Sequence, residues 1–193
     1  DGFIIHDEEL RPHLPESDVP VYVVPLRMDI SQFRADSSSS SNEIPNILHA
    51  PSRRSTKGTK YILNVQQKTK FPCNLVLVEG KTQAEALKLY EKADIIFDQI
   101  SVGTYGVFAI EAMALGKPVL AYISPEMIEK LPENLPLVNV NPNNIIEKID
   151  LLLSDSKLRY SIGENSRKYV EEYHDYLTNA KLLKAIYEYE GEE

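Results

Sequence analysis

The sequence predicts an α/β fold, in which a Rossmann-like, doubly wound parallel sheet is followed by helices at the C-terminal end. Two patterns predict this fold. Short, continuously apolar segments rich in β-branched residues alternate with segments of helical periodicity, which is typical of parallel sheets covered on both faces. From Pro142 onward, the spacing of the apolar residues is helical to the end of the chain.

The first third of the chain is expected to lie outside this sheet. Val19–Leu26 ("VPVYVVPL") has the composition of a strand. Arg34–Pro45 ("RADSSSSSNEIP") is polar and serine-rich and has no apolar periodicity, which predicts a linker. The predicted organisation is therefore residues 1–33, a linker at 34–45 and a main domain at 46–193.

Within the main domain, strands and helices are expected to alternate. Strands are expected at Asn46–Ala50, Asn74–Gly80, Asp94–Ile100 and Pro118–Tyr122, with a last short strand before Pro142. Helices are expected at Lys57–Lys68, Gln83–Ala93, Val107–Ala114, Pro142–Leu153, Ser156–His174 and Leu177–Tyr189. Thr82 and Glu85 have the spacing of a capping box, which fixes the start of one of these helices.

Composition argues against several classes of protein. The chain of 193 residues is 42% hydrophobic and 26% charged, as in ordinary globular proteins. Its formal net charge of −8 argues against nucleic-acid binding over the whole surface. Cys73 is the sole cysteine and the four histidines are scattered, so no metal site is expected. No apolar run approaches the roughly 20 residues that span a bilayer, and a reducing, cytoplasmic location is expected. Because the chain begins at Asp1, we expect it to be a piece of a longer protein or a processed form.

A cluster of basic residues follows the first strand of the predicted sheet. The loop "APSRRSTKG" places Arg53, Arg54 and Lys57 at the expected start of a helix, where positive charge and free N–H groups favour an anion. The alternative is a solvated basic loop. The loops Ser52–Gly58, Glu79–Lys81 and Gln99–Gly106 all follow strands and are expected to share one rim, where ligands bind in such sheets.

A second glycine-containing loop precedes the segment Val107–Ala114. Gly106, Val107 and Phe108 would offer free backbone N–H groups there, and two helix starts beside a basic cluster suit a diphosphate. Glu111 lies within this apolar segment, where an ionised carboxylate is costly unless it has a partner. Ribose hydroxyls would provide one. The alternative is a glutamate on the exposed side of an amphipathic helix.

These stretches resemble the C-terminal nucleotide-sugar-binding domain of retaining GT-B glycosyltransferases, the glycosyl transferases of group 1. "GTYGVFAIEAMALGKPVLAY" resembles the family's motif of two glutamates, in which Ala-Met-Ala-x-Gly-x-Pro-Val follows the second. "HAPSRRSTKGTKYI" resembles its basic loop, and "YEKADIIFD" resembles its Tyr-x-x-Ala-Asp strand entry. "VPVYVVPLRMDISQF" resembles the segment that connects the two domains of such enzymes. The resemblance runs in order over most of the chain.

The resemblance implies roles for individual residues. Glu111 matches the motif's second glutamate, which holds the ribose, and Lys57 matches the lysine that binds the diphosphate. The loop's usual arginine falls at Ser52, so Arg53 or Arg54 is expected to supply its charge. The motif's first glutamate, which contacts the donor sugar, falls at Gly103. Asp98, Gln99 or Tyr105 is therefore expected to contact the sugar instead. The predicted catalytic residues are Arg53, Lys57 and Glu111, and the predicted donor site consists of Arg54, Glu79, Gly80, Asp98, Gln99, Gly103, Tyr105, Gly106, Val107, Phe108 and Glu111.

The resemblance also implies a function. The chain is expected to be the donor-binding part of an enzyme that transfers a sugar from a nucleoside diphosphate sugar to an acceptor with retention, as in polysaccharide biosynthesis. No metal or other cofactor is expected. The N-terminal acceptor domain is expected to be missing except for its final segment, residues 1–33, so the chain alone is expected to be inactive. A peripheral association of the full-length enzyme with membranes is left open, and no nucleic-acid partner is expected.

Two other readings remain at this point. The domain could bind a nucleotide sugar without turning it over, and Gly103 would then mark a lost catalytic role. It could also be an unrelated receiver-like or flavodoxin-like interaction protein. A receiver domain would have an acidic pair after the first strand, where this chain is basic, and "PSRRSTKG" serves poorly as a flavodoxin phosphate loop.

Overall fold

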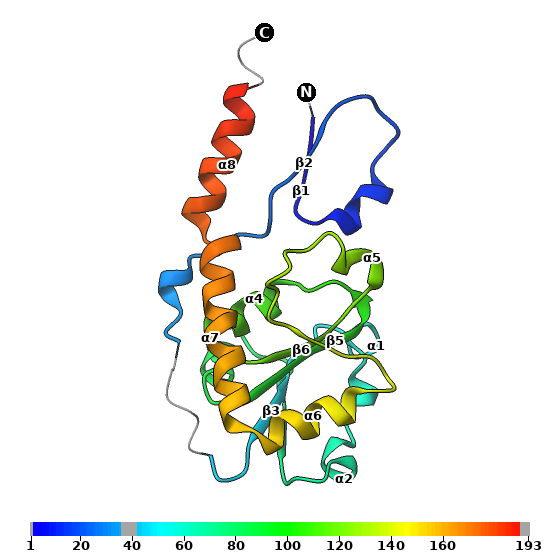
Figure 1. Ribbon diagram of the computed structural model, residues 1–193, viewed down its shortest axis with the longest axis vertical. Coiled ribbons are helices and arrows are strands. Elements are labelled where there is room, and N and C mark those ends of the chain that lie inside the picture. Colours follow the sequence, from blue (N-terminus) through cyan, green and yellow to red (C-terminus); the bar gives the residue numbers. More distant parts are fainter. Residues whose placement is uncertain (1, 36–41, 190–193) are drawn as a thin grey trace.

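The computed structural model describes residues 2–35 and 42–189 and contains a five-stranded parallel sheet with strand order β4-β3-β5-β6-β7 (Figure 1). The strands are β3 (Asn46–His49), β4 (Asn74–Leu77), β5 (Ile95–Gly103), β6 (Val119–Ile123) and β7 (Val138–Asn139). All four pairings are parallel. The predicted parallel α/β sheet is thus confirmed.

Helices cover both faces of this sheet because neighbouring strand residues point to opposite sides. Leu48 and Ile96 join a core cluster with residues of α3 (Gln83–Tyr90), α4 (Val107–Ala114) and α7 (Ser156–Tyr173). Ile47 and Ile95 join a second cluster with residues of α2 (Val65–Lys68) and α6 (Ile145–Ser154). The sheet is therefore doubly wound, as predicted.

Local sequence signals fix several elements. Thr82 and Glu85 form the predicted capping box at the start of α3. The bounds of α4 coincide with the predicted segment, and its residues from Ala109 to Ala114 are buried. The predicted C-terminal helices are present as α6, α7 and α8 (Tyr176–Tyr189). The short helix α5 (Pro125–Ile128), capped by the Ser124 side chain, was not predicted.

The predicted helix over Lys57–Lys68 is wrong. This segment instead contains the end of a single turn, α1 (Arg54–Lys57), a 3₁₀ turn, η3 (Thr59–Tyr61), and α2. Gly58 ends the first turn in the left-handed region, with φ 70°. A Cβ at Gly58 would clash with Cγ2 of Ile100 on β5, so the glycine lets this turn pack closely on the sheet.

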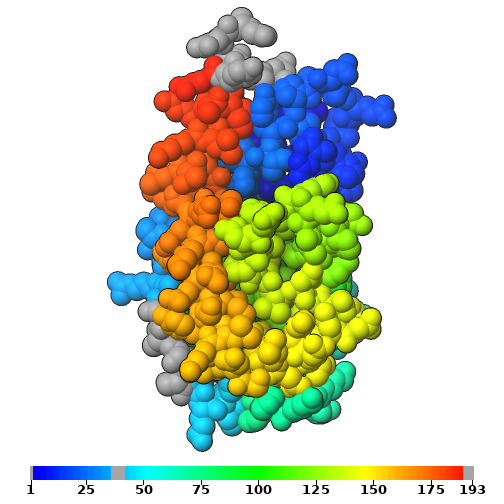
Figure 2. Space-filling view, viewed as in Figure 1, coloured from blue at the N-terminus to red at the C-terminus, as the bar shows by residue number. Residues whose placement is uncertain are grey.

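The N-terminal segment forms a small separate sheet. β1 (Phe3–Ile5) pairs in parallel with β2 (Val21–Val23), and the 3₁₀ helix η1 (Glu8–His13) lies in the connection between them. Only β2 falls within a predicted strand. In Figures 1 and 2 this segment lies at the same end of the molecule as α8, above α5. Half of the predicted serine-rich linker, residues 36–41, lies outside the described residues.

The junction between α7 and α8 holds the chain that leaves this small sheet. His174 Nδ1 donates to the Leu26 carbonyl at 2.7 Å, and an isolated parallel bridge joins Met28 to Asp175. A short 3₁₀ helix, η2 (Ile30–Gln32), follows, and its Ile30 joins the core. Among the described helices, none is long and apolar enough to cross a membrane.

Candidate functional site

The strand order places a topological switch point between β3 and β5. From β3 the chain passes to β4 on one side, and it then returns to β5 on the other side. Ligands of open α/β sheets bind beyond the carboxyl ends of the strands at such a point. The loops that follow β3 and β5 are the two that carry the predicted anion site, with Arg53, Arg54 and Lys57 on one side and Gly103–Gly106 on the other.

Lys57 and Asp98 form an ion pair across this switch point. The Lys57 Nζ lies 2.5 Å from Asp98 Oδ1; the side chain of Lys57 is 17% exposed and that of Asp98 is 0% exposed. Burial raises the pKa of the Asp98 carboxyl, and the charge of Lys57 opposes this rise. The Gly106 N–H also favours the charged carboxylate. Oδ2, however, makes no direct hydrogen bond with the described residues.

A buried histidine fixes the surroundings of this pair. His49 Nδ1 lies 2.9 Å from the Phe97 carbonyl and therefore donates to it, so Nε2, also at 2.9 Å, accepts from the Thr59 hydroxyl. Burial lowers the pKa of His49 to about 4. The neutral imidazole thus connects β3, β5 and η3 without adding charge.

Glu111 is buried on α4, with 5% of its surface exposed. Its Oε1 accepts a hydrogen bond of 2.6 Å from Gln83 Nε2 at the start of α3. Burial raises the pKa of Glu111, and the Gln83 hydrogen bond opposes the rise. The alternative of a glutamate on an exposed helix face is therefore wrong. Sequence reasoning missed Gln83, because its contact with Glu111 spans two helices.

Of the two arginines in the basic loop, one is paired and one is not. Arg54 makes two hydrogen bonds to Glu79, of 2.8 and 2.6 Å, and so ties the loop after β3 to the loop after β4. This pair is exposed. Arg53 is exposed and has no ion-pair partner among the described residues. Gly80, beside Glu79, has φ 64° and open space where a Cβ would point.

The Gly106 N–H at the start of α4, which the sequence expects to be free, interacts with the Asp98 carboxylate. Gly106 is the N-cap of α4, and no side chain caps the helix. No atom lies within 4 Å of where a Cβ of Gly106 would be, and Val107 is exposed. By contrast, α1 is only one turn long, which weakens the predicted contribution of its helix start to anion binding.

The side chain of Gln99 holds an irregular part of β5. Its Oε1 accepts from the N–H groups of Ser101 and Val102, while Nε2 donates to the carbonyls of Thr104 and Tyr122, both at 2.7 Å. These bonds replace the regular hydrogen bonds between strands at the point where the register of β5 against β6 shifts. All four bonds use its amide, so the predicted contact of Gln99 with a sugar would need them to break.

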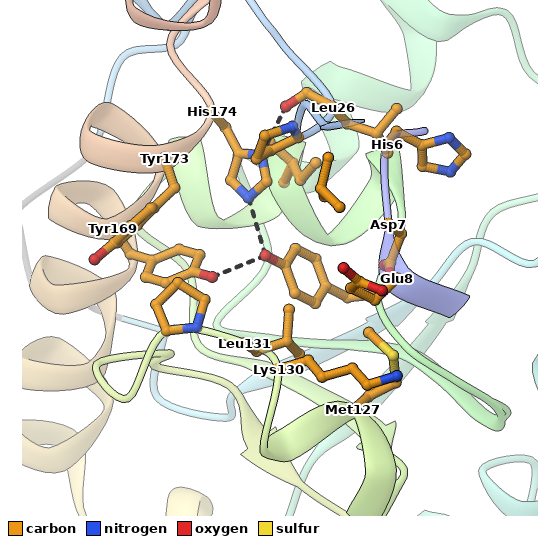
Figure 3. Close-up of a pocket in the computed structure, with 15 residues that line it drawn as sticks. His6, Asp7, Glu8, Leu26, Met127, Lys130, Leu131, Tyr169, Tyr173 and His174 are labelled. Carbon is orange, nitrogen blue, oxygen red and sulfur yellow. Dashed lines mark hydrogen bonds between the residues drawn. The ribbon is translucent and has the colours of Figure 1, made fainter. Parts of the chain in front are cut away.

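Tyr105 lines a cavity of about 210 Å³ between the N-terminal segment, which contributes Glu8, and the main domain, which contributes Lys130 (Figure 3). Its hydroxyl lies 2.8 Å from that of Tyr169 and 3.0 Å from His174 Nε2. Nearby, the Thr104 hydroxyl donates to Asp7 at 2.7 Å, which ties the N-terminal segment to the same loop. No sequence motif marks this cavity, because it forms only where segments far apart in the chain meet.

The predicted residues therefore divide into two groups. Arg53, Lys57, Gly106 and Glu111 border the switch point or lie on the elements beside it, whereas Tyr105 faces the separate cavity. The sugar contacts of Asp98, Gln99 and Tyr105 stay predictions. Among the described residues, no cluster of three or more His, Cys, Asp and Glu side chains could hold a metal ion.

Comparison with known proteins identifies the family. Residues 57–169 match the family described as "Glycosyl transferases group 1". The chain belongs to this family. It is 32% identical over 130 residues to an uncharacterized glycosyltransferase of Methanocaldococcus jannaschii, a match that covers 66% of this chain and 32% of that protein. The matched part thus spans about a third of that relative's length.

Solved structures show the same fold. HepE of Anabaena, in complex with UDP and glucose, superposes with a TM-score of 0.75 at 14% identity, over 96% of this chain and 62% of that chain. The C-terminal domain of LpcC, a group 1 glycosyl transferase from Francisella tularensis, gives 0.61 at 22% identity, over 77% and 99%. These matches fit a GT-B C-terminal domain, and the family assignment excludes the receiver-like and flavodoxin-like readings.

Proposed function

We propose that this chain is the donor-binding part of a glycosyltransferase that transfers a sugar from a nucleoside diphosphate sugar to an acceptor, with retention of configuration. The observation that carries the proposal is the placement of Lys57 and of the start of α4, which no side chain caps, on either side of Asp98 at the switch point between β3 and β5. Glu111 lies one turn further along the same helix. A diphosphate is bound by a cation, and the ribose joined to it is bound by a hydrogen-bond acceptor, and Lys57 and Glu111 are arranged to supply the two.

The proposed chemistry relies on charge. Negative charge develops on the diphosphate as it leaves the sugar, and Lys57, Arg53 and the N–H groups at the start of α4 would stabilise it. Glu111 would accept hydrogen bonds from the ribose hydroxyls. Its buried carboxylate accepts a hydrogen bond from Gln83, and a ribose would give it a second kind of donor. No step of this chemistry requires a cofactor.

The wider context is also proposed. An acceptor-binding domain is needed to orient the acceptor and exclude water, so we expect residues 1–193 alone to transfer no sugar. We propose a cytoplasmic location, where nucleotide sugars would be available to the enzyme. Support for a nucleotide-sugar ligand comes from HepE, which was solved with UDP-glucose and with UDP and glucose.

Calorimetric titration of the chain with UDP, GDP and ADP tests the site. At least one should bind, and Lys57→Ala and Glu111→Ala should each weaken that binding at least tenfold, as expected for the loss of about 1.4 kcal/mol. Lys68→Ala is the matched control, because Lys68 is exposed at the end of α2, away from the switch point. If both site variants bind as the wild type does, the site is wrongly placed.

A second candidate function is nucleotide-sugar binding without transfer. It is favoured by Gly103, which stands where the family motif has a carboxylate and has φ 92°, a conformation that a glutamate adopts only with strain. If a complete two-domain protein carrying this chain binds a nucleotide sugar but neither transfers nor hydrolyses it, the binding function is correct and the enzymatic one is not.

A further inference from the structure

The pairing of β5 with β6 directs Asp98 away from the regular sheet. Phe97 pairs with Leu120, and Gln99 pairs with the next residue, Ala121, so Asp98 is the extra residue of a β-bulge. Bulges change the direction of a side chain and are frequent beside functional sites. Here the bulge coincides with the contact between Asp98 and Lys57.

Lys57 is held at this position from its other side. Gly58 directly follows it and packs against Ile100, two residues beyond Asp98 on the same strand. The lysine is 17% exposed and the aspartate is 0% exposed. The ammonium group of Lys57 thus contacts a fully buried carboxylate, while part of the lysine side chain stays exposed.

We propose that Asp98 is the positioning residue for Lys57, and that a diphosphate binds at this site together with a proton taken up by Asp98. This inference rests on the proposed function, since it requires a diphosphate at the switch point beside Lys57. It assigns Asp98 a role other than the sugar contact that the sequence suggests. In the free protein, Asp98 holds the ammonium in place before the ligand arrives.

The proton follows from the balance of charge. A diphosphate that draws the ammonium of Lys57 toward itself weakens the ion pair at Asp98 Oδ1, and the uncharged Gly106 N–H does not replace that charge. Oδ2 has no direct hydrogen bond with the described residues to compensate. A buried carboxylate beside a bound anion is destabilised by desolvation and by like charge, and protonation from the solvent removes both costs.

Among the residues that the structure describes, no other group near Asp98 replaces the charge of Lys57. His49 on β3 is neutral and uses both ring nitrogens, and Tyr90 on α3 is a buried phenol whose pKa rises to about 12. Glu111 on α4 is itself acidic. Arg54 is occupied by Glu79. Burial already raises the pKa of Asp98 in the free protein, which is the direction that proton uptake requires.

The proton count of binding tests this inference. The probes are UDP-glucose, GDP-mannose and ADP-glucose, because their diphosphates stay fully ionised between pH 6 and 8 and release no proton of their own. The binding enthalpy is measured at pH 7 in buffers of different ionisation enthalpy, and its slope gives the protons taken up. We expect up to about one proton for the wild type and an affinity that rises as the pH falls.

Asp98→Asn removes the titrating group and keeps the shape of the side chain. We expect this variant to take up no proton and to bind with an affinity that no longer depends on pH. Glu147→Gln is the matched control, since Glu147 also pairs with a lysine, Lys148, but is exposed on α6; it should keep the wild-type proton count. Circular dichroism establishes that each variant is folded.

The outcomes separate the two proposals. If the wild type binds a probe without taking up a proton, the inference about Asp98 is wrong and the donor site stands, whether or not Asp98→Asn folds. Equal proton counts in the wild type and Asp98→Asn also overturn it. If none of the three probes binds, and UDP, GDP and ADP do not bind either, the proposed donor site fails and the inference fails with it.

Discussion

Replacing Gly58 by alanine would show how strongly the turn that carries Lys57 depends on close packing against β5. Gly58 has φ 70°, and a Cβ there would clash with Cγ2 of Ile100. The left-handed conformation costs a non-glycine residue about 1–2 kcal/mol. Forcing an extra methyl group into a packed site costs about 1–3 kcal/mol more. We therefore expect Gly58→Ala to lower the free energy of unfolding by roughly 2–5 kcal/mol.

Gly80→Ala separates the two contributions. Gly80 has nearly the same conformation, φ 64°, but no atom lies within 4 Å of where its Cβ would be. Alanine at this position should therefore cost only about 1–2 kcal/mol, from the backbone conformation alone. The difference between the two variants measures the clash with Ile100.

Urea unfolding followed by circular dichroism gives both values. The midpoint should fall further for Gly58→Ala than for Gly80→Ala, with the slope m unchanged in both. If the two substitutions destabilise the protein equally, α1 is not packed against β5 as described, and the account of how Lys57 is positioned fails. If m changes, the comparison is made by thermal unfolding, where the same order of melting temperatures is expected.

Three further predictions concern titrating groups. Because burial raises the folded-state pKa of Glu111, the wild type should lose stability as the pH rises through that value. The stability of Glu111→Gln relative to the wild type should therefore be higher at pH 8 than at pH 4, and equal differences at the two pH values would contradict this. Burial lowers the pKa of His49 from 6.5 to about 4, so the resonances of its ring should not titrate above pH 5 in NMR. The free energy of unfolding should fall by at most about 3 kcal/mol as the pH falls from 6.5 toward 4. Titration of the ring near pH 6.5 would refute the burial of His49. Gln83→Ala should raise the pKa of Glu111 further, as measured by carboxyl ¹³C shifts, because the hydrogen bond that favours the ionised form is lost; an unchanged value would show that this bond is absent in solution.

The sequence predicts best what local interactions determine. The capping box of Thr82 and Glu85 and the bounds of α4 depend on residues within a few positions of each other, and both are confirmed. Alternation of apolar strands and helices was enough for the fold class. The basic loop and the apolar surroundings already singled out Lys57 and Glu111, and the resemblance to GT-B enzymes supplied the roles predicted for them.

Long-range contacts account for what the sequence did not predict. The break at Gly58 depends on Ile100, and the role of Gln99 depends on a shift in pairing with β6. Tyr105 was expected near the donor sugar because it lies in the motif, but its direction is set by Tyr169 and His174, more than 60 residues away in the chain. The ion pair of Asp98 with Lys57 was not predicted either, because it also joins residues that lie far apart in the chain.

The central claim is that a nucleoside diphosphate binds at the switch point between β3 and β5. Amide-resolved NMR titration of the chain with UDP, GDP and ADP tests it most directly, because it locates the ligand without any substitution. We predict that the largest shift changes occur at Lys57, Gly58 and Gly106–Phe108, the backbone groups nearest the proposed diphosphate. Changes confined to the cavity around Tyr105, with Lys57 and Gly106 unaffected at saturation, would contradict the claim.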